Sequence, residues 1–154
     1  MRIMLLSVKP SVYESIRTGE KIFEHRRSFP NEDILAYLYV SKPIKAIQGF
    51  VYLKNRHTIK DWEIEFSYDT EAIARIKKYE ESYRYAMEIA SFQETTAICL
   101  EKLKQDFDNF YVPQSYIYLE GKPLHKYIES NLVPVGDVIE HDFSVIQSNQ
   151  VCVK

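Results

Sequence analysis

Hydrophobic and polar positions at the start of the chain predict a strand, a helix and a second strand. Residues 3–8 are apolar apart from one serine and are soon followed by a proline, which is typical of a buried strand. Pro10 suits the first turn of a helix, and the apolar spacing predicts that this helix covers residues 10–18 and ends at Gly19. Residues 21–27 then alternate, which predicts the second strand.

Further strands are predicted where short runs of β-branched and aromatic residues lie between turn residues. These runs cover residues 34–40, 46–53 and 116–119, and an edge strand is expected within 132–139, where two helix-breaking residues interrupt the pattern. Gly49 lies inside one of these runs, and a glycine there often marks a bulge or a sharp bend. A short helix is expected just after the run at 116–119, over residues 124–130.

Residues 60–106 show a helical pattern instead. Six of their residues recur at intervals of three and four, which predicts one narrow apolar stripe on a helix. The stripe comprises Tyr85, Ile89, Phe92, Thr96, Cys99 and Leu103. It would either pack against the body of the domain, which we favour because an apolar face must be buried, or bind a partner, for example as a homodimer surface.

This order of elements predicts an α+β fold, a small mixed β-barrel with flanking helices. We expect one domain over residues 1–154, with a helical insertion at about 60–106. The length of 154 residues is typical of one domain.

Charge is unevenly distributed along the chain, although the net charge is only −2. Residues 1–59 carry ten Lys and Arg against five Asp and Glu, whereas residues 60–108 carry seven against twelve. The basic first third suggests an anionic partner for that region. The overall balance argues against strong nonspecific binding of nucleic acid by the whole chain.

Other function classes find little support in the sequence. Cys99 and Cys152 are isolated, and the four histidines show no paired spacing, so we expect neither a metal site nor a cofactor. No apolar stretch approaches 18 residues, and the apolar N-terminal run is too short for a signal peptide. We therefore expect a cytoplasmic protein that has no membrane segment.

Charged residues on both faces of the strand predicted at 21–27 are the candidate chemistry. Lys21 and Glu24 are three residues apart and would face opposite ways, but Lys21 lies at the turn after Gly19, from where it could reach a cleft shared with Glu24 and Arg26. Such a group suits either anion binding or acid–base chemistry. The alternative is a set of ordinary surface ion pairs, which contribute only about 0–1 kcal/mol each.

Three segments of the chain resemble the ASCH family, whose members are related to the PUA fold. The motif Gly-x-Lys-x-x-Glu-x-Arg of that family matches Gly19, Lys21, Glu24 and Arg26, and the preceding Lys9-Pro10 also fits. Residues 38–49 are similar to the strand–turn–strand that follows, and residues 113–119 resemble a late strand. The resemblance implies a PUA-like barrel with a cleft that binds RNA or a nucleotide or nucleoside.

The resemblance also implies roles for individual residues. Lys21, Glu24 and Arg26 would be catalytic if the protein is an enzyme, either a ribonuclease or a metal-independent amide hydrolase acting on N4-acetylcytidine. The acetylcytidine hydrolases resemble Lys-x-x-Thr-x-Arg at this place, so that Glu24 departs from their pattern and implies a different mechanism.

Three hypotheses therefore stand: RNA or nucleotide binding without catalysis, hydrolysis of a modified nucleoside or RNA, and protein interaction through the helical stripe. For the first, phosphate contacts would come from a basic cleft and stacking from a nearby aromatic ring. The candidate ligand-binding residues are Lys9, Arg27, Ser41, Lys42, Lys45, Phe23 and Tyr39.

Overall fold

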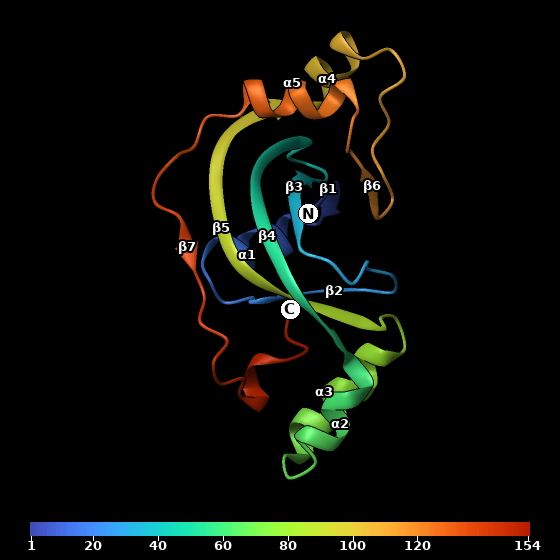
Figure 1. Cartoon of the computed structure of the whole chain (residues 1–154), viewed down its shortest axis with the longest axis vertical. Coiled ribbons are helices and arrows are strands. Elements are labelled where there is room, and N and C mark those ends of the chain that lie inside the picture. The colour runs from blue at the N-terminus through green and yellow to red at the C-terminus, as the bar shows by residue number, and fades with distance from the viewer.

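The structure, a computed structural model, describes all residues from 1 to 154. Its centre is a seven-stranded sheet that curls strongly around itself (Figure 1). The strands follow the order β2-β5-β4-β3-β1-β6, and β7 pairs with β5 outside this path. Their bounds are β1 Arg2–Val8, β2 Phe23–Arg26, β3 Ile34–Val40, β4 Ala46–Thr58, β5 Tyr85–Cys99, β6 Tyr116–Tyr118 and β7 Ile139–Glu140.

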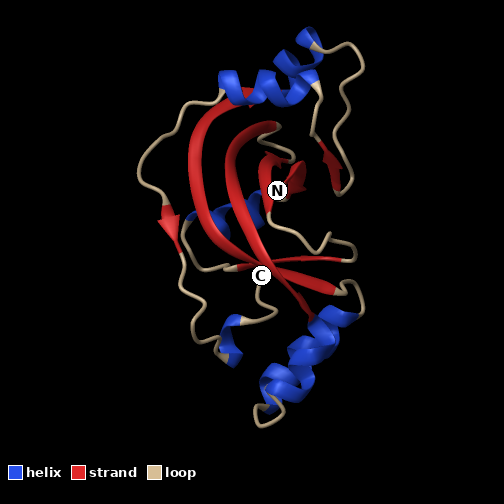
Figure 2. Cartoon of the chain, in the orientation of Figure 1, coloured by secondary structure: helices blue, strands red, loops and turns tan.

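Helices cover the sheet at its two ends and behind it (Figure 2). The helix α1 (Pro10–Arg17) follows β1, and α2 (Trp62–Glu65) and α3 (Thr70–Glu80) lie together at one end. At the opposite end lie α4 (Leu100–Asp106) and α5 (Pro123–Asn131). Two short 3₁₀ turns, η1 (Ile59–Asp61) and η2 (Ser148–Gln150), complete the elements. None of the helices is long and apolar enough to cross a membrane.

Both faces of β1 are buried, which explains its nearly continuous apolar sequence. Met4 and Leu6 face a cluster that includes Ile16 of α1, whereas Leu5 belongs to a second cluster beneath α4 and α5. β1 pairs with β3 in parallel, and the helix α1 occurs in the long connection that parallel pairing requires. A third cluster, with Trp62 fully buried, lies beneath α2 and α3.

Most of the strands and helices expected from the sequence are confirmed. The α+β fold, the elements of the first 58 residues, the strand near 116 and the helix near 124 occur where predicted. Gly19 adopts a φ of 85°, which is the left-handed conformation expected after a helix. The pairing of β4 with β5 shifts register next to Gly49, as the glycine predicted.

The apolar stripe predicted for a helix lies instead on β5, so that this part of the helical insertion is wrong. Residues 62–65 and 70–80 are helical as expected, but residues 85–99 form the longest strand. The register shifts show why: between the pairs Leu53↔Ile89 and Tyr52↔Ser91, β5 holds one extra residue. Each bulge breaks the alternation of a strand, so the apolar residues recur at helix-like intervals.

The expected edge strand at residues 132–139 is also wrong in most of its length. Pro134 makes a single bridge to Thr95, and a regular pair with β5 forms only at Ile139–Glu140. Pro134 has no N–H group to donate to a ladder, and Gly136 has a φ of 73°, which no regular strand contains. The backbone therefore follows β5 without pairing continuously with it.

Gly49 supports a testable prediction about the packing of β4, β5 and α1. A methyl group added at Gly49 would lie 3.0 Å from the Phe92 ring and 3.1 Å from the Gln93 carbonyl. We therefore expect Gly49→Ala to lower the free energy of unfolding by about 1–3 kcal/mol, the usual effect of overpacking. Urea denaturation measures this loss.

Gly121→Ala is the matched control, because a methyl group there meets nothing within 4 Å and only the φ of 71° disfavours it. We expect a loss of about 1 kcal/mol for this variant. If Gly49→Ala proves no more damaging than Gly121→Ala, the close approach of the strands at Gly49 does not limit the side chain.

Candidate functional site

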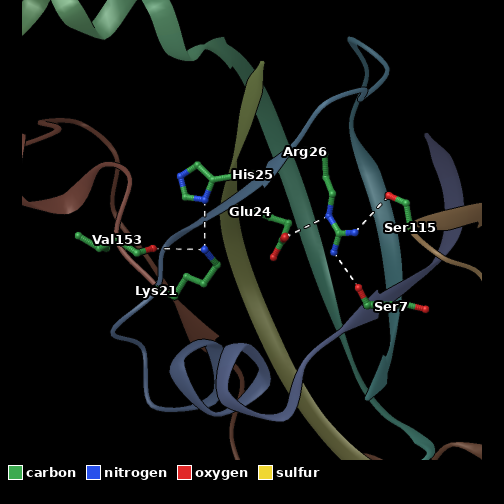
Figure 3. Close-up of polar contacts among 7 residues, drawn as sticks. All are labelled: Ser7, Lys21, Glu24, His25, Arg26, Ser115 and Val153. Carbon is green, nitrogen blue, oxygen red and sulfur yellow. Dashed lines mark hydrogen bonds and ion pairs between the residues drawn. The ribbon is translucent and has the colours of Figure 1, made fainter. Parts of the chain in front are cut away.

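The strand β2 presents two different sets of polar side chains on its two faces. Glu24 and Arg26 point to one side, towards β1 and β6, whereas His25 points to the other side (Figure 3). This division follows from strand alternation and is the one expected from the sequence. The register with β5, Glu24↔Met87 and His25↔Ala86, fixes the two faces.

Arg26 joins the two edges of the curled sheet. Its Nη2 donates to the carbonyl oxygen of Ser7 in β1 at 2.8 Å, and its Nη1 donates to Ser115 Oγ, next to β6, at 3.2 Å. Its Nε donates to Glu24 Oε1 at 3.2 Å. A guanidinium group has five N–H donors, so two of them remain without a partner in the protein. We call Ser7, Glu24, Arg26 and Ser115 the seam site.

Glu24 is a buried carboxylate with unused bonding capacity. Only 5% of the residue is exposed, and Oε2 is buried without any hydrogen-bond partner. A buried carboxylate oxygen ordinarily accepts hydrogen bonds, because the cost of removing it from water is large. The seam site therefore offers one free acceptor on Glu24 beside two free donors on Arg26.

Lys21 lies on the other side of β2, against His25 and the C-terminal segment (Figure 3). Its Nζ is 3.1 Å from His25 Nδ1 and 3.4 Å from the carbonyl oxygen of Val153. Burial lowers the pKa of Lys21, and the charge of Glu24 partly opposes this effect by raising that pKa. Lys21 is therefore coupled to the seam site through the field of Glu24, although no hydrogen bond or ion pair joins the two residues.

His25 is buried in an environment that disfavours its charged form. Burial is the main cause and lowers its pKa well below 6.5, and the charges of Lys21 and Arg26 act in the same direction. Its ring packs against Tyr79 at 4.8 Å between centroids, and Nε2 is buried without a partner. The sequence placed His25 on the face of Lys21 but gave no sign of their direct contact.

The exposed basic residues predicted to bind a ligand fall into two groups. Lys9 and the turn Ser41–Lys45 lie at the same end of the sheet, because β1 and β3 are parallel and Ser41 N donates to Val8 O at 2.9 Å. The contact of Arg26 with Ser7 brings the seam site towards this end. Arg27 lines a separate cavity beyond the end of β2.

The two aromatic rings predicted to stack on a base are buried, so that this part of the prediction is wrong. Phe23 is fully buried and packs against Trp62, and Tyr39 is 2% exposed. Both residues lie on strands whose two faces are covered, and their rings contribute to the core. Alternation in the sequence could not distinguish an outward ring from one covered by a second layer of helices.

A cavity of about 510 Å³ adjoins the seam site and was not expected from the sequence. Residues 111–117 line it, and Ser115 also accepts from Arg26. Tyr111 is 61% exposed in this segment. In the sequence, the only signal for this cavity is an aromatic residue, Tyr111, in a stretch before Pro113 that has no strand or helix pattern.

No group of three or more His, Cys, Asp or Glu side chains is placed to hold a metal ion. The polar groups of the seam site are a guanidinium, a carboxylate, a hydroxyl and a carbonyl oxygen. Such groups suit hydrogen bonding to an anionic or polar ligand.

Comparison with known proteins gives one curated relative and several similar structures. No family model matches the sequence. The chain is 26% identical over 134 residues to a protein from Zymomonas mobilis named an ASCH domain-containing ribonuclease, covering 80% of this chain and 88% of that protein. The crystal structure of ASCH from Zymomonas mobilis matches with a TM-score of 0.64 at 23% identity, covering 86% of this chain and 96% of that one. A variant of the same protein matches with a TM-score of 0.64 at 22% identity, covering 84% and 96%.

The buried His25 leads to a prediction about pH. In the unfolded chain His25 is protonated near its ordinary pKa of 6.5, whereas in the folded protein burial lowers its pKa well below that value. The free energy of unfolding should therefore fall as the pH drops below about 6.5, with a slope of up to about 1.4 kcal/mol per pH unit for one proton. Denaturant unfolding between pH 7.5 and 5 measures the slope.

The variant His25→Phe keeps an aromatic ring in place and removes the titrating group. We expect its slope to be shallower than that of the wild type. His141, whose pKa burial also lowers, contributes equally to both proteins and cancels in the comparison. Equal slopes would mean that His25 protonates as readily in the folded protein as in the unfolded chain.

Proposed function

We propose that this chain is an RNA-binding protein of the ASCH-domain family, to which its relative and the similar structures are assigned. The observation that carries this proposal is the seam site, where Arg26 retains two free N–H donors beside a cavity that contains the exposed ring of Tyr111. A phosphate group can accept from Arg26, and an unpaired base can stack on Tyr111.

The exposed cations near the seam site support the same proposal. Lys9, Lys42 and Lys45 are exposed, lie at the end of the sheet that Arg26 approaches, and form no ion pair within 4.0 Å. Contacts of this kind supply affinity for the backbone of RNA without reading its sequence. Because the net charge of the chain is −2, we expect RNA to bind at this local region, with an affinity that falls as salt increases.

Cleavage of RNA is the second candidate function, favoured by the relative that is named a ribonuclease. Glu24 Oε2, which is buried in the free protein, would have to become accessible when RNA binds, and could then accept the proton of a ribose 2′-hydroxyl group as that hydroxyl oxygen attacks the adjoining phosphorus atom. Arg26 could stabilise the negative charge that develops on the phosphate oxygens. The bond between phosphorus and the 5′-oxygen then breaks, the 5′-oxygen takes up a proton from solvent, and the other fragment ends in a 2′,3′-cyclic phosphate.

Binding of RNA can be tested through Tyr111, which contributes little to the core. We expect Tyr111→Ala to weaken binding of a short single-stranded RNA by roughly 10-fold, since loss of one stacked base costs about 1–3 kcal/mol. Fluorescence anisotropy with a labelled RNA measures this at two salt concentrations. Tyr68→Ala is the control, because Tyr68 is 75% exposed and lies between α2 and α3. Equal losses in both variants would contradict the proposed site.

Cleavage can be tested separately from binding with Glu24→Gln. The amide can still accept from Arg26 but cannot take up a proton, so we expect cleavage to slow by about 100-fold or more while RNA binding is kept. Gel analysis of labelled RNA follows the products. If wild-type protein binds RNA without cutting it, the binding function stands alone. Deacetylation of N4-acetylcytidine by the wild type would instead favour the amide-hydrolase alternative.

A further inference from the structure

We propose that a second cavity, between the end of β2 and the connection from α3 to β5, binds one nucleotide of the RNA and prefers guanine. The proposal rests on the RNA-binding function and adds a separate subsite to it. The cavity has a volume of about 450 Å³, within the range of small-molecule sites. Eight residues line it: Arg27, Thr58, Lys60, Glu80, Glu81, Ser82, Tyr83 and Arg84.

Three cations around this cavity are free to bind a phosphate group. Arg27, Lys60 and Arg84 form no ion pair within 4.0 Å and no side-chain hydrogen bond, although two carboxylates line the same cavity. The guanidinium of Arg84 lies over the ring of Tyr85 at 5.1 Å, which restrains its direction. Unpaired cations around a concave surface attract an anion, and the phosphate of a nucleotide matches this arrangement.

Tyr83 supplies an aromatic surface at the same cavity. Its ring packs against Tyr79 at 5.7 Å and against His25 at 6.1 Å between centroids, yet 38% of the residue stays exposed. A tyrosine held in this way loses little freedom when a base stacks on it. The buried ring of His25 and the ring of Tyr79 therefore support the ring of Tyr83.

The carboxylates explain why we expect guanine rather than any base. Glu80 Oε1 is buried without a hydrogen-bond partner, and burial together with the neighbouring Glu63 raises the pKa of Glu80. Glu81 is exposed on the same rim. The Watson–Crick edge of guanine presents two adjacent N–H donors, which the exposed carboxylate of Glu81 can accept together, whereas adenine and uracil present only one group of donors there.

The position of the cavity fits a strand of RNA that also occupies the seam site. Arg26 and Arg27 are consecutive residues at the end of β2 and belong to the seam site and the second cavity respectively. The backbone N–H of Arg84 donates to the carbonyl oxygen of Arg26 at 3.2 Å, which fixes the connection from α3 beside β2. Because consecutive residues of a strand point to opposite faces (Figure 3), an RNA strand that contacts both sites would pass around the end of β2.

Calorimetric titration of the full chain with 5′-GMP, 5′-AMP, 5′-UMP and inorganic phosphate tests this proposal. We expect GMP to bind at least 10-fold more tightly than AMP or UMP, and phosphate to bind most weakly. Tyr83→Ala and Arg84→Ala should each weaken GMP binding about 10-fold. Glu81→Gln and Glu80→Gln should reduce the preference for GMP over AMP. Lys78→Ala, an exposed cation of α3 outside the cavity, should change nothing.

Several outcomes would overturn the proposal. Equal affinities for GMP, AMP and UMP would contradict the preference for guanine. If inorganic phosphate binds as tightly as GMP, the cavity is an anion site and does not recognise a nucleotide. If Tyr111→Ala weakens RNA binding while Arg84→Ala alters neither RNA nor GMP binding, this subsite is wrong and the proposed function stands. If the wild type binds neither RNA nor GMP, both proposals fail. Circular dichroism confirms that each variant is folded.

Discussion

The contact of Arg26 across the seam of the sheet is the interaction on which the site depends. A curled sheet that does not close leaves two edge strands, here β2 and β6, whose backbone groups need partners. β6 begins at Tyr116, which pairs with Leu6, so the carbonyl oxygen of Ser7 lies beyond the end of this ladder and accepts from Arg26 instead. One side chain thus links both edges and is held rigidly where a ligand can reach it. Glu24 is then required beside it, since a guanidinium with 15% of its side chain exposed needs a nearby counter-charge.

The two faces of β2 carry different electrostatic environments because different layers cover them. On the inner face Glu24 and Arg26 form an ion pair, with Arg26 Nε 3.2 Å from Glu24 Oε1. On the outer face the third apolar cluster and the C-terminal segment bury Lys21 and His25, and the resulting loss of hydration lowers both of their pKa values. Lys21 is 4% exposed and its Nζ donates to the carbonyl oxygen of Val153, so a substrate does not reach it in this arrangement. The inner face of β2 therefore carries the polar groups that are free to bind a ligand, the two unused N–H donors of Arg26.

Local patterns in the sequence predicted the first 58 residues well because each signal there is short-range: an apolar run, a proline at a helix start, a glycine after its end. They failed on β5, where bulges at Ala90 and beyond Glu94 replaced strict alternation by helix-like spacing. For the site, alternation correctly paired Glu24 with Arg26. The partners Ser7 and Ser115, 19 and 89 residues away from Arg26, could not be inferred, since only the curling of the sheet brings them near Arg26. Phe23 and Tyr39 were likewise predicted to stack on a base, but a second layer of the fold buries both rings, which alternation in the sequence does not reveal.

The distribution of charge along the chain is a poor guide to where free charge lies in the folded protein. Within the basic first third, Arg2, Arg17 and Arg26 are neutralised by Glu120, Glu14 and Glu24, and Arg56 is occupied by the carbonyl oxygen of Phe29. The acidic middle contributes two of the three free cations of the second cavity, Lys60 and Arg84, beside the single Arg27 of the basic segment. An anion is attracted by cations that lack a partner, and pairing is set by the fold. The anionic ligand should therefore follow the end of β2, where segments of opposite overall charge meet, and not the basic segment as a whole.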